Sequence, residues 1–176
     1  MSIRFVLLRA VNVGGTAKLP MAGLRDIAAD LGATDVSTYI ASGNLIADVP
    51  GDAANFDRAL EMAIEKQYGF FRDVISRTPA ELLAAVDAHP FAVENPRFSY
   101  VRFLATKPAA EAIAKAEAYP TGDDEWRVVG TEMHIRYARG AGRPQMNVDA
   151  ITRTLETPGT ARNLNTVSKL INLAYP

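Results

Sequence analysis

The first half of the chain alternates between the apolar period of a strand and that of a helix. The run from Ile3 to Leu8 is apolar on both faces, which predicts a central strand covered by helices. Further strands are predicted at 36–40, 45–49 and 70–77, and helices at 20–31 and 53–68. The resulting order is β-α-β-β-α-β, the split βαβ order of ferredoxin-like folds.

The second half follows the same plan in part. Thr78 and Glu81 flank Pro79 in a capping-box pattern, which predicts a helix from there to His89. Later strands are predicted at 99–105, 126–129 and 132–137, and helices at 108–119, 147–156 and 163–174. No final strand is predicted. The expected fold class is therefore α+β, a ferredoxin-like β-α-β-β-α-β unit followed by a second, incomplete plait-like β-α-β-β-α unit with C-terminal helices.

The proline-containing connector from Phe91 to Phe98 is the predicted boundary between the halves. We expect residues 1–90 to form the ferredoxin-like subdomain with its following helix, and residues 91–176 the second plait-like subdomain. Together they are expected to make one compact structural unit.

Composition narrows the function classes. The chain has 176 residues, 48% of them apolar and 22% charged, and its net charge of −1 lacks the overall basic character of many nucleic-acid-binding proteins. With no cysteine and only two histidines, disulfides, thiolate chemistry and a histidine-rich metal cluster are excluded, and no metal site is expected. No apolar run approaches the roughly 20 residues of a membrane span and no signal peptide is recognisable, so we expect a cytoplasmic protein without a membrane partner.

A polar segment follows the first strand. Arg9 and Asn12 precede the pair Gly14-Gly15, just ahead of a helix. A guanidinium together with backbone N–H groups favours an anion such as a carboxylate or phosphate. The segment matches neither the Walker pattern nor the dinucleotide-binding glycine pattern. The alternative is an ordinary turn, with Arg9 paired to an acid at the sheet edge.

The predicted hairpin turn brings a second polar group. Ser42 and Asn44 flank Gly43, and they could bind a ligand or simply supply the turn chemistry that a hairpin needs. In the expected topology, this turn, the segment after the first strand and Tyr68-Gly69 share one edge of the sheet. The two polar groups are therefore expected to converge.

A third group lies near the C-terminus. Arg162 stands before the predicted last helix, Asn163 can cap it, and Asn165 and Lys169 share one face four residues apart. Capping accounts for one asparagine. The remaining donors fit either an anion site at the helix N-terminus or a solvated face.

Arginine is also concentrated around the glycines of the segment 139–144. Arg136, Arg139 and Arg143 could form a mobile basic lid, although a solvated loop explains them as well. The acids from Asp123 to Glu125 fit a solvated turn. No catalytic residue is identified, because neither histidine has a serine–acid pattern near it in the sequence.

Three segments resemble the bacterial family called domain of unknown function 1697. They are LLRAVNVGGTAKLPMAGLRDIAADLG from Leu7, TYIASGNLI from Thr38 and TARNLNTVSKL from Thr160. The resemblance covers nearly the whole chain, with the segments in the family's order. It implies an α/β plait fold but no established activity. The three polar groups coincide with these segments, so the resemblance implies one shared site.

This chain departs from the family's pattern at a few positions. The family usually has glycine where Ala10 stands and tryptophan where Leu164 stands. Its glycine-arginine segment commonly continues with Ser-Lys, whereas this chain has Pro144-Gln145. A family role for that lysine therefore does not carry over.

Three functions are compatible with the sequence. The first is binding of a small anionic or phosphate-bearing ligand in a polar groove between the subdomains, with or without catalysis; its residues would be Arg9, Asn12, Gly14, Gly15, Ser42, Asn44, Arg162, Asn163, Asn165 and Lys169. The second is a nucleic-acid-binding plait module, against which the net charge and the scarcity of aromatics on the central strands argue. The third is a regulatory or assembly domain, which leaves a homodimer open. No cofactor is indicated.

Overall fold

The computed structural model describes residues 1–175, which divide into two compact units. The first unit comprises Met1–Leu82 and the last residues from Leu170, and the second comprises Leu83–Lys169. This division falls within the helix that precedes the predicted boundary at residue 90. No described helix is both long and apolar enough to cross a membrane.

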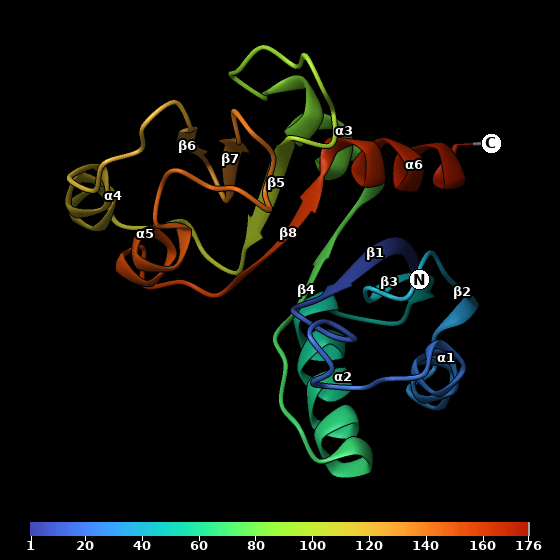
Figure 1. Cartoon of the computed structure of the whole chain (residues 1–176). Helices are drawn as coiled ribbons and strands as arrows, with labels where there is room; N and C mark the ends of the chain where they lie inside the picture. Colours follow the sequence, from blue (N-terminus) through green and yellow to red (C-terminus); the bar gives the residue numbers. More distant parts are fainter. Residues whose placement is uncertain (176) are drawn as a thin grey trace. The chain divides into compact units, whose positions relative to one another are not determined.

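The first unit contains an antiparallel sheet whose strand order is β2-β3-β1-β4 (Figure 1). Its elements are β1 (Ser2–Leu8), α1 (Met21–Asp30), β2 (Thr34–Thr38), β3 (Asn44–Val49), α2 (Ala53–Tyr68) and β4 (Val74–Arg77), and α3 (Pro79–Asp87) follows. The prediction that β1 is central is confirmed, because it pairs with both β3 and β4. Phe5 and Leu7 on one face and Val6 and Leu8 on the other are all fully buried.

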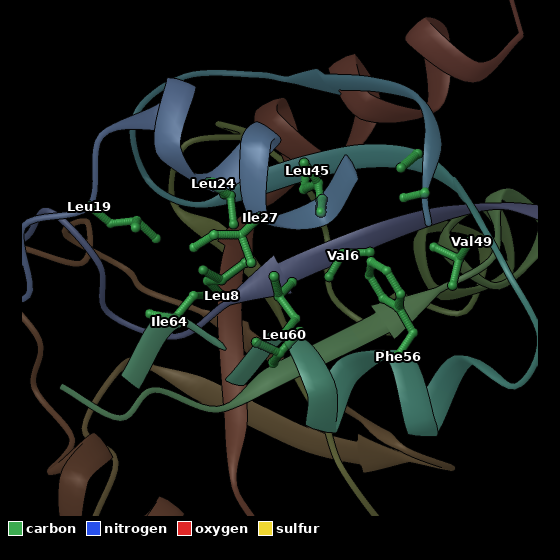
Figure 2. Close-up of a cluster of buried hydrophobic side chains, with 14 of the residues drawn as sticks. Val6, Leu8, Leu19, Leu24, Ile27, Leu45, Val49, Phe56, Leu60 and Ile64 are labelled. Carbon is green, nitrogen blue, oxygen red and sulfur yellow. The ribbon is translucent and has the colours of Figure 1, made fainter. Parts of the chain in front are cut away.

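Helices α1 and α2 cover one face of this sheet (Figure 2). The predicted apolar stripe of α2, formed by Phe56, Leu60 and Ile64, packs into the core with Val6 and Leu8. Full burial of each such large aliphatic or aromatic side chain contributes about 1.5–3 kcal/mol. This core holds β1 and the loop that follows it in place.

The predicted helix ends of this region are also confirmed. Asp52 caps α2 by accepting a hydrogen bond from the Asn55 amide at 3.0 Å. Thr78 and Glu81 form the expected capping box, since each accepts a hydrogen bond from the other's backbone N–H, at 2.7 and 3.1 Å.

The second unit has its own antiparallel sheet, with strand order β6-β7-β5-β8. Its elements are β5 (Ser99–Leu104), α4 (Ala110–Glu117), β6 (Glu125–Val129), β7 (Glu132–Arg136), α5 (Val148–Thr154), β8 (Gly159–Asn163) and α6 (Leu164–Ala174). Side chains of α4 and α5 pack with Met133 and Ile135 of β7 to form the core on one face.

The prediction that the second unit lacks a final strand is wrong. Gly159–Asn163 forms β8, which pairs antiparallel with β5 and makes the order β-α-β-β-α-β in this unit as well. The segment contains one β-branched residue, Thr160, and follows a Pro-Gly break, so its local propensity for a strand is weak. Pairing with β5 decides its conformation, which is a tertiary effect.

The strand predicted at 70–77 is shorter than expected. β4 begins at Val74, so Phe70 and Phe71 lie in the loop before it. They therefore place no aromatic side chain on the sheet.

Candidate functional site

Three loop segments meet at one edge of the first sheet, which we call the loop edge: Arg9–Lys18, Ala41–Asn44 and Arg72–Asp73. The amide of Leu8 donates a hydrogen bond to the Gly43 carbonyl at 2.9 Å, and the amide of Arg9 donates one to the Asp73 carbonyl at 3.0 Å. The expected convergence of the segment after β1 with the β2–β3 turn is thus confirmed. The third segment, at the entry to β4, reaches this edge through Arg72 and Asp73, and the expected place of Tyr68-Gly69 there stays a prediction.

Asn12 holds the loop edge together. Its Nδ2 donates hydrogen bonds to the carbonyls of Leu19 at 2.8 Å and Ala41 at 2.7 Å, and its Oδ1 accepts one from the Leu19 amide at 2.8 Å. Both side-chain N–H groups are therefore used inside the protein. Its predicted contact with a ligand stays a prediction, and its structural role is to tie α1 and the β2–β3 turn to the end of β1.

The glycine pair forms the tip of a short hairpin. Gly14 and Gly15 have φ of 61° and 74°, and the Thr16 amide donates a hydrogen bond to the Val13 carbonyl at 3.2 Å. Two successive positive φ values define a type I′ turn, which favours glycine at both positions. A Cβ at either glycine would meet nothing within 4 Å, so backbone conformation alone requires glycine here.

The turn between β2 and β3 is closely packed. Gly43 has φ of 84°, and a Cβ there would lie 2.6 Å from the Val11 side chain. Asn44 is fully buried, and its Nδ2 donates to the Tyr39 carbonyl at 3.0 Å and to Ser42 Oγ at 3.1 Å. These polar residues therefore build the turn, as the structural alternative expected.

Two guanidinium groups lie at the loop edge. Arg9 Nη1 is 3.4 Å from Asp73 Oδ2, and the Arg9 side chain is 48% exposed. Arg72 Nε donates to the Ala10 carbonyl at 3.3 Å, and its guanidinium carbon lies 5.6 Å from the centre of the Phe70 ring. Sequence reasoning missed Arg72 because the segment was assigned to a strand. Its signal was a basic residue directly before the strand that pairs with β1.

The C-terminal polar group lies in the second unit. Arg162 is on β8, two residues before α6 begins, and its Nη1 donates to Thr160 Oγ1 at 2.6 Å and to the Ala161 carbonyl at 2.9 Å. Burial lowers the pKa of Arg162 to about 10. The capping role of Asn163 is confirmed, because its Oδ1 accepts from the Thr166 amide at 2.9 Å. A joint site with the loop edge stays a prediction.

The remaining two predicted residues of this group, Asn165 and Lys169, are exposed on α6. Their position is compatible with a solvated face, which was one of the two alternatives. Their contact with a ligand stays a prediction.

Two buried carboxylates on α2 seal the outer edge of β4. Glu61 Oε1 accepts a hydrogen bond from the Val74 amide at 2.8 Å, and Asp57 Oδ2 accepts from the amide and the hydroxyl of Ser76 at 3.1 and 2.9 Å. Burial raises the pKa of Asp57 to about 6 and also raises that of Glu61. Sequence reasoning missed them, although two acids four residues apart beside an apolar stripe were a signal.

The basic segment of the second unit is anchored by Asp124. This carboxylate is 2% exposed and accepts hydrogen bonds from the amides of Ala138 at 2.9 Å, Gln145 at 2.6 Å and Met146 at 3.1 Å. One of the three acids expected in a solvated turn is thus a buried anchor. The exposed Arg139 and Arg143 lie between these anchored ends.

Comparison with known proteins identifies the family. The family profile described as "Protein of unknown function (DUF1697)" matches residues 1–134. The chain belongs to this family. Two of the family's segments contribute Arg9–Lys18 and Ala41–Asn44 to the loop edge, and the shared site that the resemblance implied stays a prediction.

A solved structure shares the fold. It is a conserved bacterial protein from Streptococcus pneumoniae, with a TM-score of 0.70, 21% sequence identity and 97% of each chain covered. At this identity the likeness concerns the fold alone. No curated protein matches this member of the family.

Proposed function

We propose that this protein binds a small anionic or phosphate-bearing ligand at the loop edge of its first unit. The observation that supports the proposal is that Arg9 and Arg72, from segments far apart in the sequence, both reach this edge beside an exposed hairpin. Guanidinium groups form strong, directional hydrogen bonds to phosphate and carboxylate oxygens. The proposal concerns binding and names no reaction.

The contacts that Arg9 and Arg72 make are compatible with ligand exchange. A half-exposed pair such as Arg9–Asp73, with 3.4 Å between Nη1 and Oδ2, contributes about 0–1 kcal/mol to stability. A phosphate that accepts two hydrogen bonds from Arg9 can therefore replace the carboxylate at low cost. Arg72 is held by two backbone carbonyls, those of Ala10 and Phe71, and by the Phe70 ring, which limits the entropy lost when a ligand binds.

The same structure argues against the nucleic-acid alternative. On β1 and β5, Phe5 and Phe103 are fully buried, and Tyr100 is half-buried with its ring packed against that of Tyr137, 5.4 Å between ring centres. A plait that binds single-stranded RNA needs exposed aromatic rings on these strands to stack against bases. We also infer that both units are ferredoxin-like plaits, for which the strand orders β2-β3-β1-β4 and β6-β7-β5-β8 are the support.

Calorimetric titration with inorganic pyrophosphate tests the proposal. We expect Arg9→Ala and Arg72→Ala each to weaken binding about ten- to a hundredfold, because a hydrogen bond to a charged group contributes about 1.5–3 kcal/mol. Arg97→Ala is the matched control, since it removes the same charge from an exposed position outside the loop edge. Equal affinity in all three variants, or no binding to the wild type, would refute the proposal.

A further inference from the structure

The two histidines of the chain, 45 residues apart, meet in the second unit. Their Nδ1 atoms are 3.0 Å apart, and the ring centres are 5.1 Å apart with an angle of 64° between the ring planes. His134 lies on β7 and is fully buried. His89 is half-buried and lies just after α3, at the start of the segment 88–98, which we call the connector.

The pair joins the connector to the second sheet. At its far end, the connector is held by the Phe98 carbonyl, which accepts a hydrogen bond from the Tyr137 amide at 2.8 Å. Between the two attachments lies a cavity of about 130 Å³, lined in part by Glu94, Asn95 and Arg136. The connector therefore lines one side of a cavity and is attached to the second sheet at both ends.

The charged neighbours of the pair do not neutralise an added proton. Arg127 on β6 pairs with His134 in the sheet, and Arg162 on β8 lies in the same row beyond Val101 of β5. On β7 itself, Arg136 and Glu132 flank His134.

Those flanking groups are engaged elsewhere. Arg136 pairs with Glu125 at 3.1 Å, and Glu132 accepts from Thr131 Oγ1 at 2.9 Å. On the connector side, the His89 and Phe91 rings are nearly perpendicular with 5.6 Å between their centres, Asp87 at the end of α3 is exposed, and Glu94 lies 4.0 Å from Arg136.

The geometry restricts the protons that the pair can hold. Two Nδ1 atoms at this distance share one proton, so one ring donates and the other accepts, and the two neutral rings are different tautomers. The Nε2 atoms of both rings are buried and lack a hydrogen-bond partner among the described residues. A further proton on the donor ring would leave two buried Nε2–H groups without an acceptor, and one more would place two Nδ1–H groups against each other.

We propose that the His89–His134 pair is an acid-released latch, which closes the connector over the second sheet at neutral pH and lets it open on acidification. Burial lowers the pKa of both rings from 6.5, to about 4 for His134, where the nearby His89 adds to the effect. Because the pKa values are lower in the closed form than the ordinary 6.5, the closed form has its full stability above pH 6.5 and loses stability as the pH falls toward 4. Released His89 takes up the proton in solvent.

Nuclear magnetic resonance of the two imidazole rings in the whole protein tests the latch. At neutral pH we expect one ring to carry its proton on Nδ1 and the other on Nε2. We expect neither Cε1–H signal to titrate with a midpoint near 6.5. Two rings of the same tautomer, or two independent titrations near 6.5, would overturn the proposal.

Hydrogen exchange of the connector provides the second measurement. After correction for intrinsic exchange rates, we expect the opening constant of residues 88–98 to rise about tenfold for each pH unit below 6, as one proton is taken up. His89→Asn should abolish this rise, because the amide can donate to His134 Nδ1 and, after rotating, accept from it once protonated. We choose His89→Asn because, unlike His89→Ala, it keeps a side-chain hydrogen bond to His134. If the opening constant of residues 88–98 in this variant depended on pH as it does in the wild type, the proposal would be overturned.

Discussion

Replacing Asp57 by asparagine should stabilise the protein, although it removes a carboxylate that accepts two hydrogen bonds. Asp57 is 7% exposed, and its Oδ1 is buried without a hydrogen-bond partner in the described part of the chain. Burial raises its pKa from 3.8 to about 6, against the opposing effect of the Ser76 hydrogen bonds. A raised pKa means that the neutral acid suits the fold better than the carboxylate.

The magnitude follows from the linkage between pKa and stability. Below the unfolded pKa of 3.8 the group is neutral in both states and does not destabilise the fold. Above about pH 6 it is ionised in both states, and the full loss of folding free energy from burying the carboxylate is present. A shift of about two units corresponds to roughly 3 kcal/mol. The asparagine oxygen, in the place of Oδ2, would keep both hydrogen bonds from Ser76, whereas the NH₂ group in the place of Oδ1 would find no acceptor among the described residues, which reduces the gain. We therefore expect Asp57→Asn to raise the free energy of unfolding by about 1–3 kcal/mol at pH 7.5 and to change it little below pH 4.

Urea denaturation of the wild type and the variant across this pH range measures the effect. Asp52→Asn is the matched control on the same helix, because asparagine caps a helix as well as aspartate does. At pH 7.5 the control should change the free energy of unfolding by only a few tenths of a kcal/mol. The reasoning would be refuted if Asp57→Asn were destabilising at pH 7.5, or if its effect did not depend on pH.

Three further substitutions, and Gly51→Ala as a control, test contacts within each unit by urea denaturation. Gly43→Ala should lower the free energy of unfolding by about 2 kcal/mol or more, because alanine is strained at this positive φ and its Cβ would clash with the Val11 side chain. Gly51 also has a positive φ but lies in open space, so Gly51→Ala should lower it by only about 1 kcal/mol. Equal losses in the two variants would contradict the close packing at Gly43. Asn12→Ala should cost about 2–4 kcal/mol and loosen the loop edge in hydrogen exchange, and a cost below 1 kcal/mol would contradict its role. Asp124→Ala should cost about 3 kcal/mol or more and increase exchange at residues 138–146, and unchanged exchange there would show that the carboxylate is not the anchor.

Local signals allowed the first unit to be predicted in detail. The doubly apolar β1, the stripe on α2 and the capping box at Thr78 are each encoded within a few residues, so periodicity and capping rules identify them. The element order then placed the β2–β3 turn beside the end of β1, and the hydrogen bond from Leu8 to Gly43 confirms that placement.

Features that depend on distant partners could not be predicted in the same way. β8 is a strand because β5 offers it a free edge, although its own residues favour a turn. Asp57 is buried because α2 seals the outer edge of β4, and His89 contacts His134 across 45 positions of sequence. The polar residues Asn12 and Asn44 looked like ligand contacts because turn-building and ligand binding use the same chemical groups.

The most direct test of ligand binding at the loop edge is a titration of the ¹⁵N-labelled protein with pyrophosphate, followed by amide chemical shifts. We expect saturable shifts confined to Arg9–Lys18, Ala41–Asn44 and Arg72–Asp73, and their loss in the double variant Arg9→Ala with Arg72→Ala. Saturable shifts confined instead to the basic segment at Arg139–Arg143, or no saturable shifts at all, would contradict a ligand site at this edge.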